Sequence, residues 1–204
     1  MHPNPAFHTA EAEQNLEYAR NRAFGVLAVC ASDGPLLAHI PFLVSADGKM
    51  AELHLVRSNP IVRMLKHPQP AKLAISGPDS YVSPDWYEVD DQVPTWNYIA
   101  VHLIGTLYVL PQDRLRDILD RQSALFEEQL APKPAWTTRK MTPNVMDRMM
   151  RSIVPCQLDI TSVDGTWKLN QNKSDNARHR AADQVARAGL GAETENLAAL
   201  MRDA

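Results

Sequence analysis

The first third of the chain alternates between short apolar runs and tight polar turns. The runs FGVLAVCA (24–31), LLAHIPFLV (36–44) and AELHLVR (51–57) are separated by SDGP and ADGK. Apolar runs bounded by Asp-Gly are typical of antiparallel hairpins. The pattern therefore predicts a three-stranded meander. SNPIVRMLKH (58–67) then reads as a short helix, because Pro60 lies in its first turn, and AKLAIS (71–76) reads as a fourth strand.

The stretch VPTWNYIAVHLIG (93–105) predicts a long strand that continues to Leu110. Alternate positions form two faces, of which one carries Thr95, Asn97, Ile99, Val101 and Leu103 and the other carries Trp96, Tyr98, Ala100, His102 and Ile104. We expect the smaller aliphatic face to fill the interior of a barrel. The aromatic face would then point outward and need a cover, either a second subunit or a flat ligand.

The rest of the pattern completes an α+β architecture. It predicts an N-terminal surface helix capped by Thr9, a loop over 77–92, helices over 111–130 and from Thr142, and a final hairpin of VPCQLDITSV and TWKLNQN around a DG turn. Two helices broken at Gly189 and Gly191 are expected over 174–204. Six or seven antiparallel strands with short helices favour a closed or nearly closed β-barrel. We expect a barrel domain over 1–172, with 173–204 as a helical extension packed on it.

Composition supports an ordered globular protein. The chain has 204 residues, 45% hydrophobic and 22% charged, with a formal net charge of -3, so the whole chain lacks the basic character of a nucleic-acid binder. Cys30 and Cys156 lie in apolar runs, where we expect free buried thiols and hence a reducing, cytoplasmic location. The N-terminus has no leader pattern, and no apolar run approaches the ~20 residues needed to cross a bilayer, so neither secretion nor membrane insertion is expected.

One segment predicts an anion site. The strand before residue 58 delivers His54 and Arg57 to the start of a helix, where a guanidinium, the Ser58 hydroxyl and free backbone N–H groups can converge on a phosphate. The alternative is an ordinary capped helix with a solvated arginine. No Gly-rich phosphate loop is found in the sequence.

Other candidate chemistry is weaker. His39, His54 and His102 lie on predicted strands but lack the close spacing of zinc ligands, so we expect three separately hydrogen-bonded imidazoles and no metal. Cys30 has no activating cation beside it, which argues against Cys-His catalysis, and no catalytic residue is identified. The amide-rich KLNQN (168–172) can read the edge of a heterocycle or can simply end a strand. ARHRAADQVAR (177–187) offers either a basic DNA contact or a solvated helix face.

Four blocks in order, HLVRSNP, GPDSYVSPDWY, VPTWNYIAVHLIG and KLNQN, resemble the PaiB-like FMN-binding negative transcriptional regulator family. The resemblance implies an FMN-binding split β-barrel like that of pyridoxamine-phosphate oxidase, assembled as a homodimer with FMN at the subunit interface. It assigns Arg57, Ser58 and Asn59, beside His54, to the FMN phosphate, and His39, Ile40 and Pro41 to the ring. It assigns Trp96, Asn97, Lys168 and Gln171 to the pocket wall.

The chain departs from the family pattern at two places. The usual Tyr-x-Pro-x-x-Phe start is represented by His2, Pro5 and Phe7, and Asn170 stands where the family has serine in KLSQN. The resemblance favours a flavin-binding regulator, although DNA binding rests on family analogy alone. An FMN-dependent oxidoreductase is the alternative, such as a flavin reductase or an enzyme like pyridoxamine-phosphate oxidase. A haem-binding protein is a weaker alternative, because related split barrels include haem binders and strand histidines are present.

Overall fold

The computed structural model describes residues 2–204, except for the side chain at position 143. The chain folds into two compact units. The first, which we call the barrel unit, comprises Leu16–Ala74 and Leu103–Val163. The second, which we call the terminal unit, comprises the residues up to Asn15 together with Ile75–His102 and Asp164–Ala204. The domain boundary predicted at residue 172 stays a prediction.

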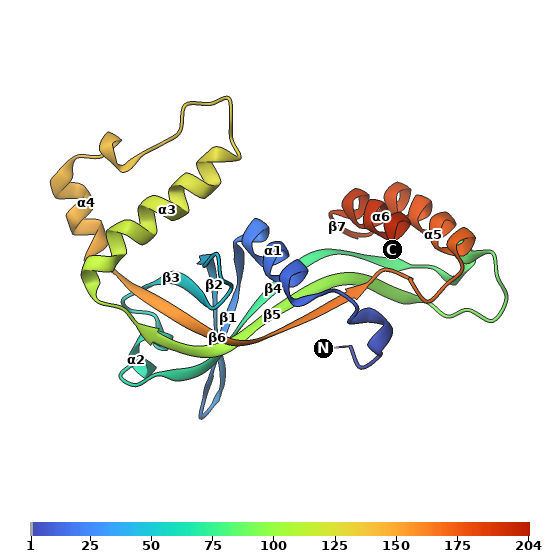
Figure 1. The fold of residues 1–204 in the computed structure, drawn as a ribbon, viewed down its shortest axis with the longest axis horizontal. Helices are drawn as coiled ribbons and strands as arrows, with labels where there is room; N and C mark the ends of the chain where they lie inside the picture. The colour runs from blue at the N-terminus through green and yellow to red at the C-terminus, as the bar shows by residue number, and fades with distance from the viewer. Residues whose placement is uncertain (1) are drawn as a thin grey trace. The chain divides into compact units, whose positions relative to one another are not determined.

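Seven strands form one sheet in the order β1-β2-β3-β6-β5-β4-β7, and β1 also pairs with β4 (Figure 1). This second pairing of β1 joins six of the strands into a ring, which confirms the expected antiparallel α+β barrel architecture. The strands are β1 (Phe24–Ala31), β2 (Gly34–Val44), β3 (Met50–Val56), β4 (Gln69–Val82), β5 (Thr95–Val109), β6 (Ile153–Lys168) and β7 (Gly191–Ala192).

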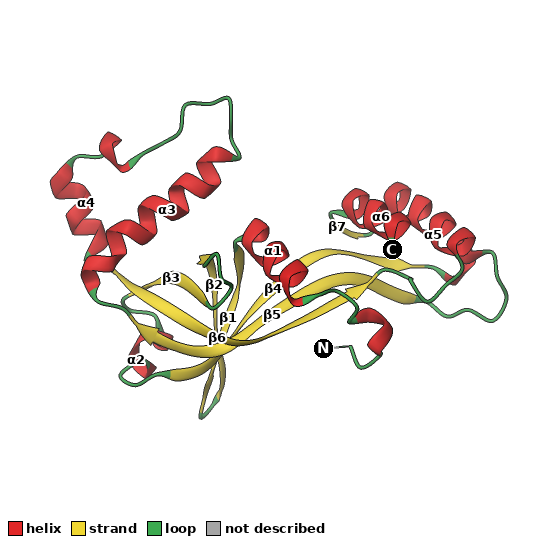
Figure 2. Cartoon of the chain, in the orientation of Figure 1, coloured by secondary structure: helices red, strands yellow, loops and turns green. Residues whose placement is uncertain are grey.

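The helices separate and follow these strands (Figure 2). The α-helices are α1 (Ala12–Arg22), α2 (Pro60–Met64), α3 (Leu115–Glu128), α4 (Pro143–Met150), α5 (Asp175–Ala188) and α6 (Thr194–Asp203), and short 3-10 helices cover Pro5–Phe7, Pro84–Tyr87, Gln112–Arg114 and Thr138–Lys140. The two predicted C-terminal helices are confirmed. Gly189 ends α5 with φ of 62°, the left-handed conformation that glycine adopts without strain.

The core of the barrel unit is built from alternate strand positions. Phe42 on β2 stands opposite Leu53 on β3, and both are fully buried. Leu27 on β1 pairs in the same way with Leu73 on β4. Because side chains alternate across a strand, one apolar face from each strand fills the interior.

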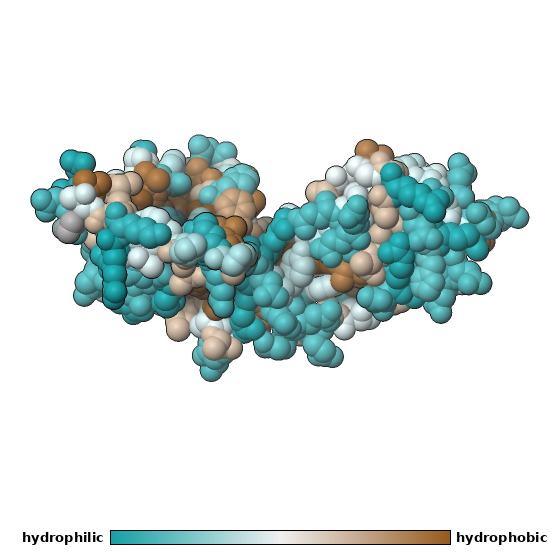
Figure 3. Space-filling model, turned by 90° about the horizontal axis from the view of Figure 1, so that it is seen from above, coloured by the Kyte–Doolittle hydropathy of each residue, from teal (hydrophilic) through white to brown (hydrophobic). Residues whose placement is uncertain are grey.

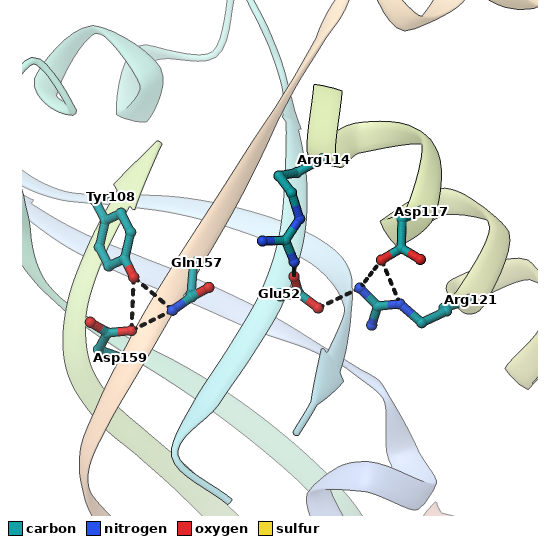
Figure 4. Close-up of polar contacts among 7 residues, drawn as sticks. All are labelled: Glu52, Tyr108, Arg114, Asp117, Arg121, Gln157 and Asp159. Atoms are coloured by element: carbon teal, nitrogen blue, oxygen red, sulfur yellow. Dashed lines mark hydrogen bonds and ion pairs between the residues drawn. The ribbon is translucent and has the colours of Figure 1, made fainter. Parts of the chain in front are cut away.

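Glu52 on β3 ties α3 to the sheet (Figure 4). Its carboxylate accepts hydrogen bonds from the guanidinium of Arg114 at 3.0 Å and from that of Arg121 at 2.6 Å. Arg121 also pairs with Asp117 one turn earlier. A second network in the same figure joins Tyr108, Gln157 and Asp159 across β5 and β6.

The terminal unit packs two helices on the outer parts of β4 and β5 (Figure 1). The buried side chains of α5 and α6 are mainly small or apolar: Ala177, Ala181, Ala182, Val185, Leu197, Ala198 and Met201. The chain between the helices is fastened to β4, because β7 pairs with it and the Ser80 hydroxyl donates to the Leu190 carbonyl at 2.8 Å. The helices therefore cover one face of these strands.

The predicted final hairpin is wrong, because β6 is a single strand through Asp164 and Gly165. Gly165 does not form a turn but allows the Asn15 side chain to approach the strand closely. A Cβ atom at position 165 would lie 2.0 Å from the Asn15 side-chain oxygen, which accepts a hydrogen bond from Trp167 Nε1 at 2.8 Å. Glycine inside a strand often marks such an approach.

The predicted loop over 77–92 is wrong in its first part, because β4 continues to Val82. Gly77 and Pro78 are both buried, so the alternation of buried and exposed positions changes phase between them. A strand can absorb such a phase change at an irregularity in its pairing. The Gly-Pro pair therefore interrupts the pattern within the strand without ending it.

The two predicted faces of β5 are confirmed. Asn97, Ile99, Val101 and Leu103 are buried, whereas the opposite positions are half-buried or exposed, and Trp96 retains 48% of its surface. The prediction for the cysteines is only partly correct. Both are free, but Cys30 is exposed, since it lies beside the β1–β2 turn at an outward position. Cys156 is buried, and burial raises the pKa of its thiol to about 12.

Candidate functional site

The phosphate site predicted from the sequence lies in the barrel unit, where β3 ends and α2 begins. Arg57 is exposed, but part of its guanidinium is fixed by the protein. Its Nε donates to the Arg151 carbonyl at 2.9 Å, and its Nη2 donates to the Ile153 carbonyl at 3.2 Å and to Gln112 Oε1 at 3.1 Å. Among the described residues its Nη1 has no acceptor. The arginine is thus held in place with one terminal amine open to solvent.

Two further donors stand beside Arg57. The hydroxyl of Ser58 is exposed and has no hydrogen-bond partner within residues 2–204. Asn59 caps α2, because its Oδ1 accepts from the Ile61 amide at 2.9 Å, which leaves its NH₂ group for another acceptor. The capped helix is confirmed, and the segment also presents an arginine, a hydroxyl and an amide to solvent. Binding of an anion by these groups stays a prediction.

His54 lies deeper than the sequence suggests. Desolvation by burial lowers the pKa of its imidazole, and a hydrogen bond with Gln122 acts in the opposite direction. Its Nδ1 is buried and finds no partner among the described residues. Gln122 is itself buried and donates to the Pro41 carbonyl at 3.2 Å, so α3 is linked to β2 at this point. Burial therefore disfavours the charged form of this imidazole.

The strand predicted to run beside the FMN ring is β2, and its side chains differ in exposure from one residue to the next. His39 is exposed, Ile40 is buried in the core and Pro41 is half-buried. Of these three residues, only His39 has a side chain that is fully open to a ligand. Ile40 can reach one only through its backbone.

In the terminal unit, Trp96 carries an open aromatic surface. Its ring meets the Tyr81 ring at a centroid distance of 6.3 Å with the rings nearly perpendicular, and Tyr81 meets Trp86 in the same way at 6.4 Å. A cavity of about 280 Å³ beside Trp96 is lined also by Tyr98, Ser76 and Asp79. Edge-to-face packing holds the indole while leaving part of it exposed.

Asn97 lies on the opposite face from Trp96 although it follows it in the chain. Its side chain is fully buried against α6, where Nδ2 lies 3.4 Å from the Met201 sulfur. Its Oδ1 has no partner among the described residues. Of the two residues, only Trp96 is placed to meet a ligand on the open face.

In KLNQN (168–172), too, one candidate residue is used for internal contacts and another lines a cavity. Gln171 closes its own turn, because its Oε1 accepts from the Leu169 amide at 2.8 Å and its Nε2 donates to the Trp167 carbonyl at 2.6 Å. Lys168 instead lines a cavity of about 210 Å³ and donates to the Thr95 hydroxyl. Desolvation lowers the pKa of this ammonium group.

Sequence reasoning did not identify the residues that surround Lys168. Phe7, Tyr87 and Thr95 line the same cavity, as does Asn170, and they come from three separate segments of the chain. In the sequence, Phe7 and Asn170 are singled out only because they lie in the two motifs where the chain departs from the family pattern. No local pattern could have grouped Phe7, Tyr87 and Asn170, because they are far apart in the sequence and only the tertiary fold joins them.

The described part of the chain offers neither a metal-ligand cluster nor a membrane-spanning helix. Residues 2–204 contain no group of three or more His, Cys, Asp or Glu side chains placed to hold a metal ion. Within the same residues no helix is long and apolar enough to span a membrane.

Comparisons of the sequence with known proteins identify a family and a relative of similar length. A family model described as "Putative FMN-binding domain" matches residues 1–162. The Bacillus subtilis protein "Protease synthase and sporulation protein PAI 2" is 25% identical over 181 residues, which cover 88% of this chain and 86% of that protein.

Solved structures share the fold at low sequence identity. The "FAD and Heme binding protein" of Mycobacterium smegmatis superposes with a TM-score of 0.57 at 17% identity, covering 90% of this chain and 81% of that one. A conserved hypothetical protein of Mycobacterium tuberculosis gives a TM-score of 0.55 at 15% identity, covering 83% and 92%. At these identities the likeness concerns the fold.

Proposed function

Because the chain belongs to the family described as "Putative FMN-binding domain", we propose that it binds FMN and that the β3–α2 corner holds the phosphate of that cofactor. The observation that carries this proposal is the open Nη1 of Arg57 beside the unpaired Ser58 hydroxyl and the Asn59 amide. Charge-assisted hydrogen bonds from arginine are well suited to phosphate oxygens. Once bound, FMN would supply hydride or electron transfer.

The proposal predicts a selective loss of FMN affinity. Replacing Arg57 by alanine should weaken FMN binding by about 1–3 kcal/mol, through loss of a charge-assisted contact. Ser58→Ala should have a smaller effect in the same direction, since it removes one neutral hydrogen bond. The measurement is a titration of flavin-free protein with FMN, followed by flavin fluorescence or visible absorbance.

Gln112→Ala is the matched control for the arginine. Gln112 accepts one of the Arg57 hydrogen bonds and donates to the Met150 and Ile153 carbonyls, but it offers nothing to a phosphate in this proposal. If Gln112→Ala weakens FMN binding as much as Arg57→Ala does, the arginine acts by supporting the local fold. Wild-type protein that takes up no FMN at all would remove the proposal itself.

We also propose that two copies of the chain form a homodimer, because apolar side chains remain exposed on the strands. In the barrel unit Leu37 is 60% exposed, Val56 56% and Phe24 49%. The face shown in Figure 3 is mostly hydrophilic, and on this face the apolar areas are small. Exposed apolar surface of this kind often marks an interface between proteins.

For the biological role we propose a regulator related to PAI 2, in which flavin binding alters the contacts of the protein with a partner. The basic segment over 177–187 gives little support to direct DNA binding by such a regulator. Arg178 is 8% exposed and pairs with Asp175, and Arg180 donates to the Tyr87 carbonyl and pairs with Glu88. These arginines are used within the terminal unit, so they offer little charge to a phosphate backbone.

An FMN-dependent oxidoreductase is the second candidate, because bound FMN would itself supply redox chemistry. The two roles separate when the FMN-loaded protein is mixed with NADH or NADPH in the presence of oxygen. Rapid, repeated bleaching and recovery of the flavin absorbance supports the enzyme. Specific binding to a promoter fragment that survives physiological salt supports the regulator.

A further inference from the structure

The cavity around Lys168 lies wholly within the terminal unit. Its volume is about 210 Å³, and it opens between the N-terminal segment, the start of β5 and the end of β6. The residues that line it are His2, Asn4, Phe7, Tyr87, Val93, Thr95, Lys168, Asn170, Asn172 and Lys173. Three distant parts of the sequence thus form one pocket.

The lining is cationic. It contains Lys168 and Lys173, and no Asp or Glu is found among these described lining residues. The pKa of His2 is lowered, first by desolvation and then by the charge of Lys168. Each lysine already has one acceptor, Thr95 for Lys168 and Gln92 for Lys173. Because an ammonium group carries three donors, each lysine retains donors for a ligand.

A buried amide in the same wall lacks an acceptor. Asn170 is 2% exposed and is held at φ of 65°, in the left-handed region. Its Oδ1 accepts from the Tyr87 hydroxyl at 3.2 Å, which fixes the orientation of the amide. Its Nδ2 has no hydrogen-bond partner among the described residues. A buried donor without an acceptor destabilises the protein, and an oxygen atom from a ligand would remove that cost.

Aromatic rings form the apolar part of the pocket. Lys168 Nζ lies 5.7 Å from the centroid of Phe7, and Lys173 Nζ lies 5.3 Å from the centroid of Tyr87. Both rings are almost fully buried. An ammonium group placed over a ring face is attracted to it, so the rings hold the two amines in position.

We propose that this cavity binds a small organic acid with a single ring, whose carboxylate meets Lys168, Lys173 and the Asn170 amide. The volume is below the roughly 300–1,000 Å³ typical of pockets for drug-sized ligands, which favours an acid with one ring over a tricyclic flavin with its phosphate. In this proposal Lys168 serves a ligand other than FMN, whereas the family resemblance assigns it to the wall of the FMN pocket. The inference does not depend on whether FMN binds.

The experiment uses benzoate as the probe and isothermal titration calorimetry as the measurement. Flavin-free protein should bind benzoate, and the neutral analogue benzamide should bind about tenfold more weakly or worse, because it lacks the charge. Lys168→Met should weaken benzoate binding by about tenfold or more. Asn170→Asp should weaken it as well, since aspartate tolerates the left-handed backbone but replaces the donor by a negative oxygen. Lys49→Met, in the exposed β2–β3 turn, is the matched control and should bind benzoate as the wild type does.

Thermal melting of each variant shows whether it is folded, and Asn170→Asp supplies a second test if Lys168→Met is not. Equal binding of benzoate and benzamide, or benzoate binding unchanged in both pocket variants, would overturn the proposal. Protein saturated with FMN should still bind benzoate. Loss of benzoate binding on saturation would assign the cavity to the flavin and would also overturn it. Absence of FMN binding leaves this titration intact, so the two proposals fail separately.

Discussion

Glu52 shows how one buried charge is compensated. Its side chain is 12% exposed and contacts two arginines whose side chains are about half exposed. A buried carboxylate without a partner is strongly unfavourable, whereas one with two guanidinium groups is tolerated. Glu52 thus determines where α3 attaches to the sheet.

Glu52→Gln should lower the free energy of unfolding by about 1–2 kcal/mol, because the neutral amide cannot accept from both arginines as a carboxylate does. Urea denaturation followed by circular dichroism measures the change. Asp117→Asn is the control, since Asp117 pairs with Arg121 at 60% side-chain exposure and should change stability little. Equal losses in the two variants would show that burial of Glu52 is unimportant.

The position of Arg57 could be predicted from the sequence, but its contacts could not. Its position at the end of an apolar strand, before a Ser-Asn-Pro cap, identified it as a candidate for anion binding. Its hydrogen bonds to the carbonyls of residues 151 and 153 were not predictable, because they join segments more than ninety positions apart. Trp96 and Asn97 were assigned together to the pocket wall, but the alternation of β5 places them on opposite faces.

At the scale of the elements, the close approach of β5 and β6 depends on Gly105. A Cβ atom at this position would lie 1.9 Å from the backbone oxygen of Asp159, and backbone cannot move aside as a flexible side chain can. Glycine is therefore required for the two strands to approach, and not for a turn.

Gly105→Ala should destabilise the barrel unit by about 1–3 kcal/mol or more, because it forces the two strands apart. A lowered midpoint of thermal unfolding measures the effect. Thr106→Ala, at the next and half-buried position, is the matched control and should shift the midpoint far less. A Gly105→Ala protein as stable as the wild type would show that the approach of β5 and β6 does not require glycine.

Local pattern predicted some elements well and others poorly, for a physical reason. β1 occupies Phe24–Ala31, the predicted range, because its alternation and its turn lie within a few residues of one another. β6 was divided in two because Asp-Gly usually signals a turn. The partner that explains Gly165 is Asn15, which lies 150 positions away, so the local signal could not reveal it.

At the scale of the whole molecule, the exposed indole of Trp96 allows a test of the proposed homodimer. Trp96→Ala should shift the mass measured by light scattering from dimer toward monomer, because removal of a large aromatic side chain from an interface costs much of its binding energy. Trp86→Ala is the control, since Trp86 also contacts Tyr81 but is less exposed. A wild-type protein that is monomeric, or variants that both stay dimeric, would remove Trp96 from the interface.

The sequence by itself determined the antiparallel strands, the terminal helices, the two faces of β5 and the position of the candidate phosphate corner. These follow from side-chain alternation, capping and turn chemistry, which act over a few residues. Only the tertiary structure decided which of the named side chains remain available. In the structure, Asn97 and Gln171 make internal contacts, whereas part of Arg57 stays open. Phe7, Tyr87 and Asn170 lie around Lys168. Hydrogen bonds and burial between distant segments make that selection, and no local pattern contains them.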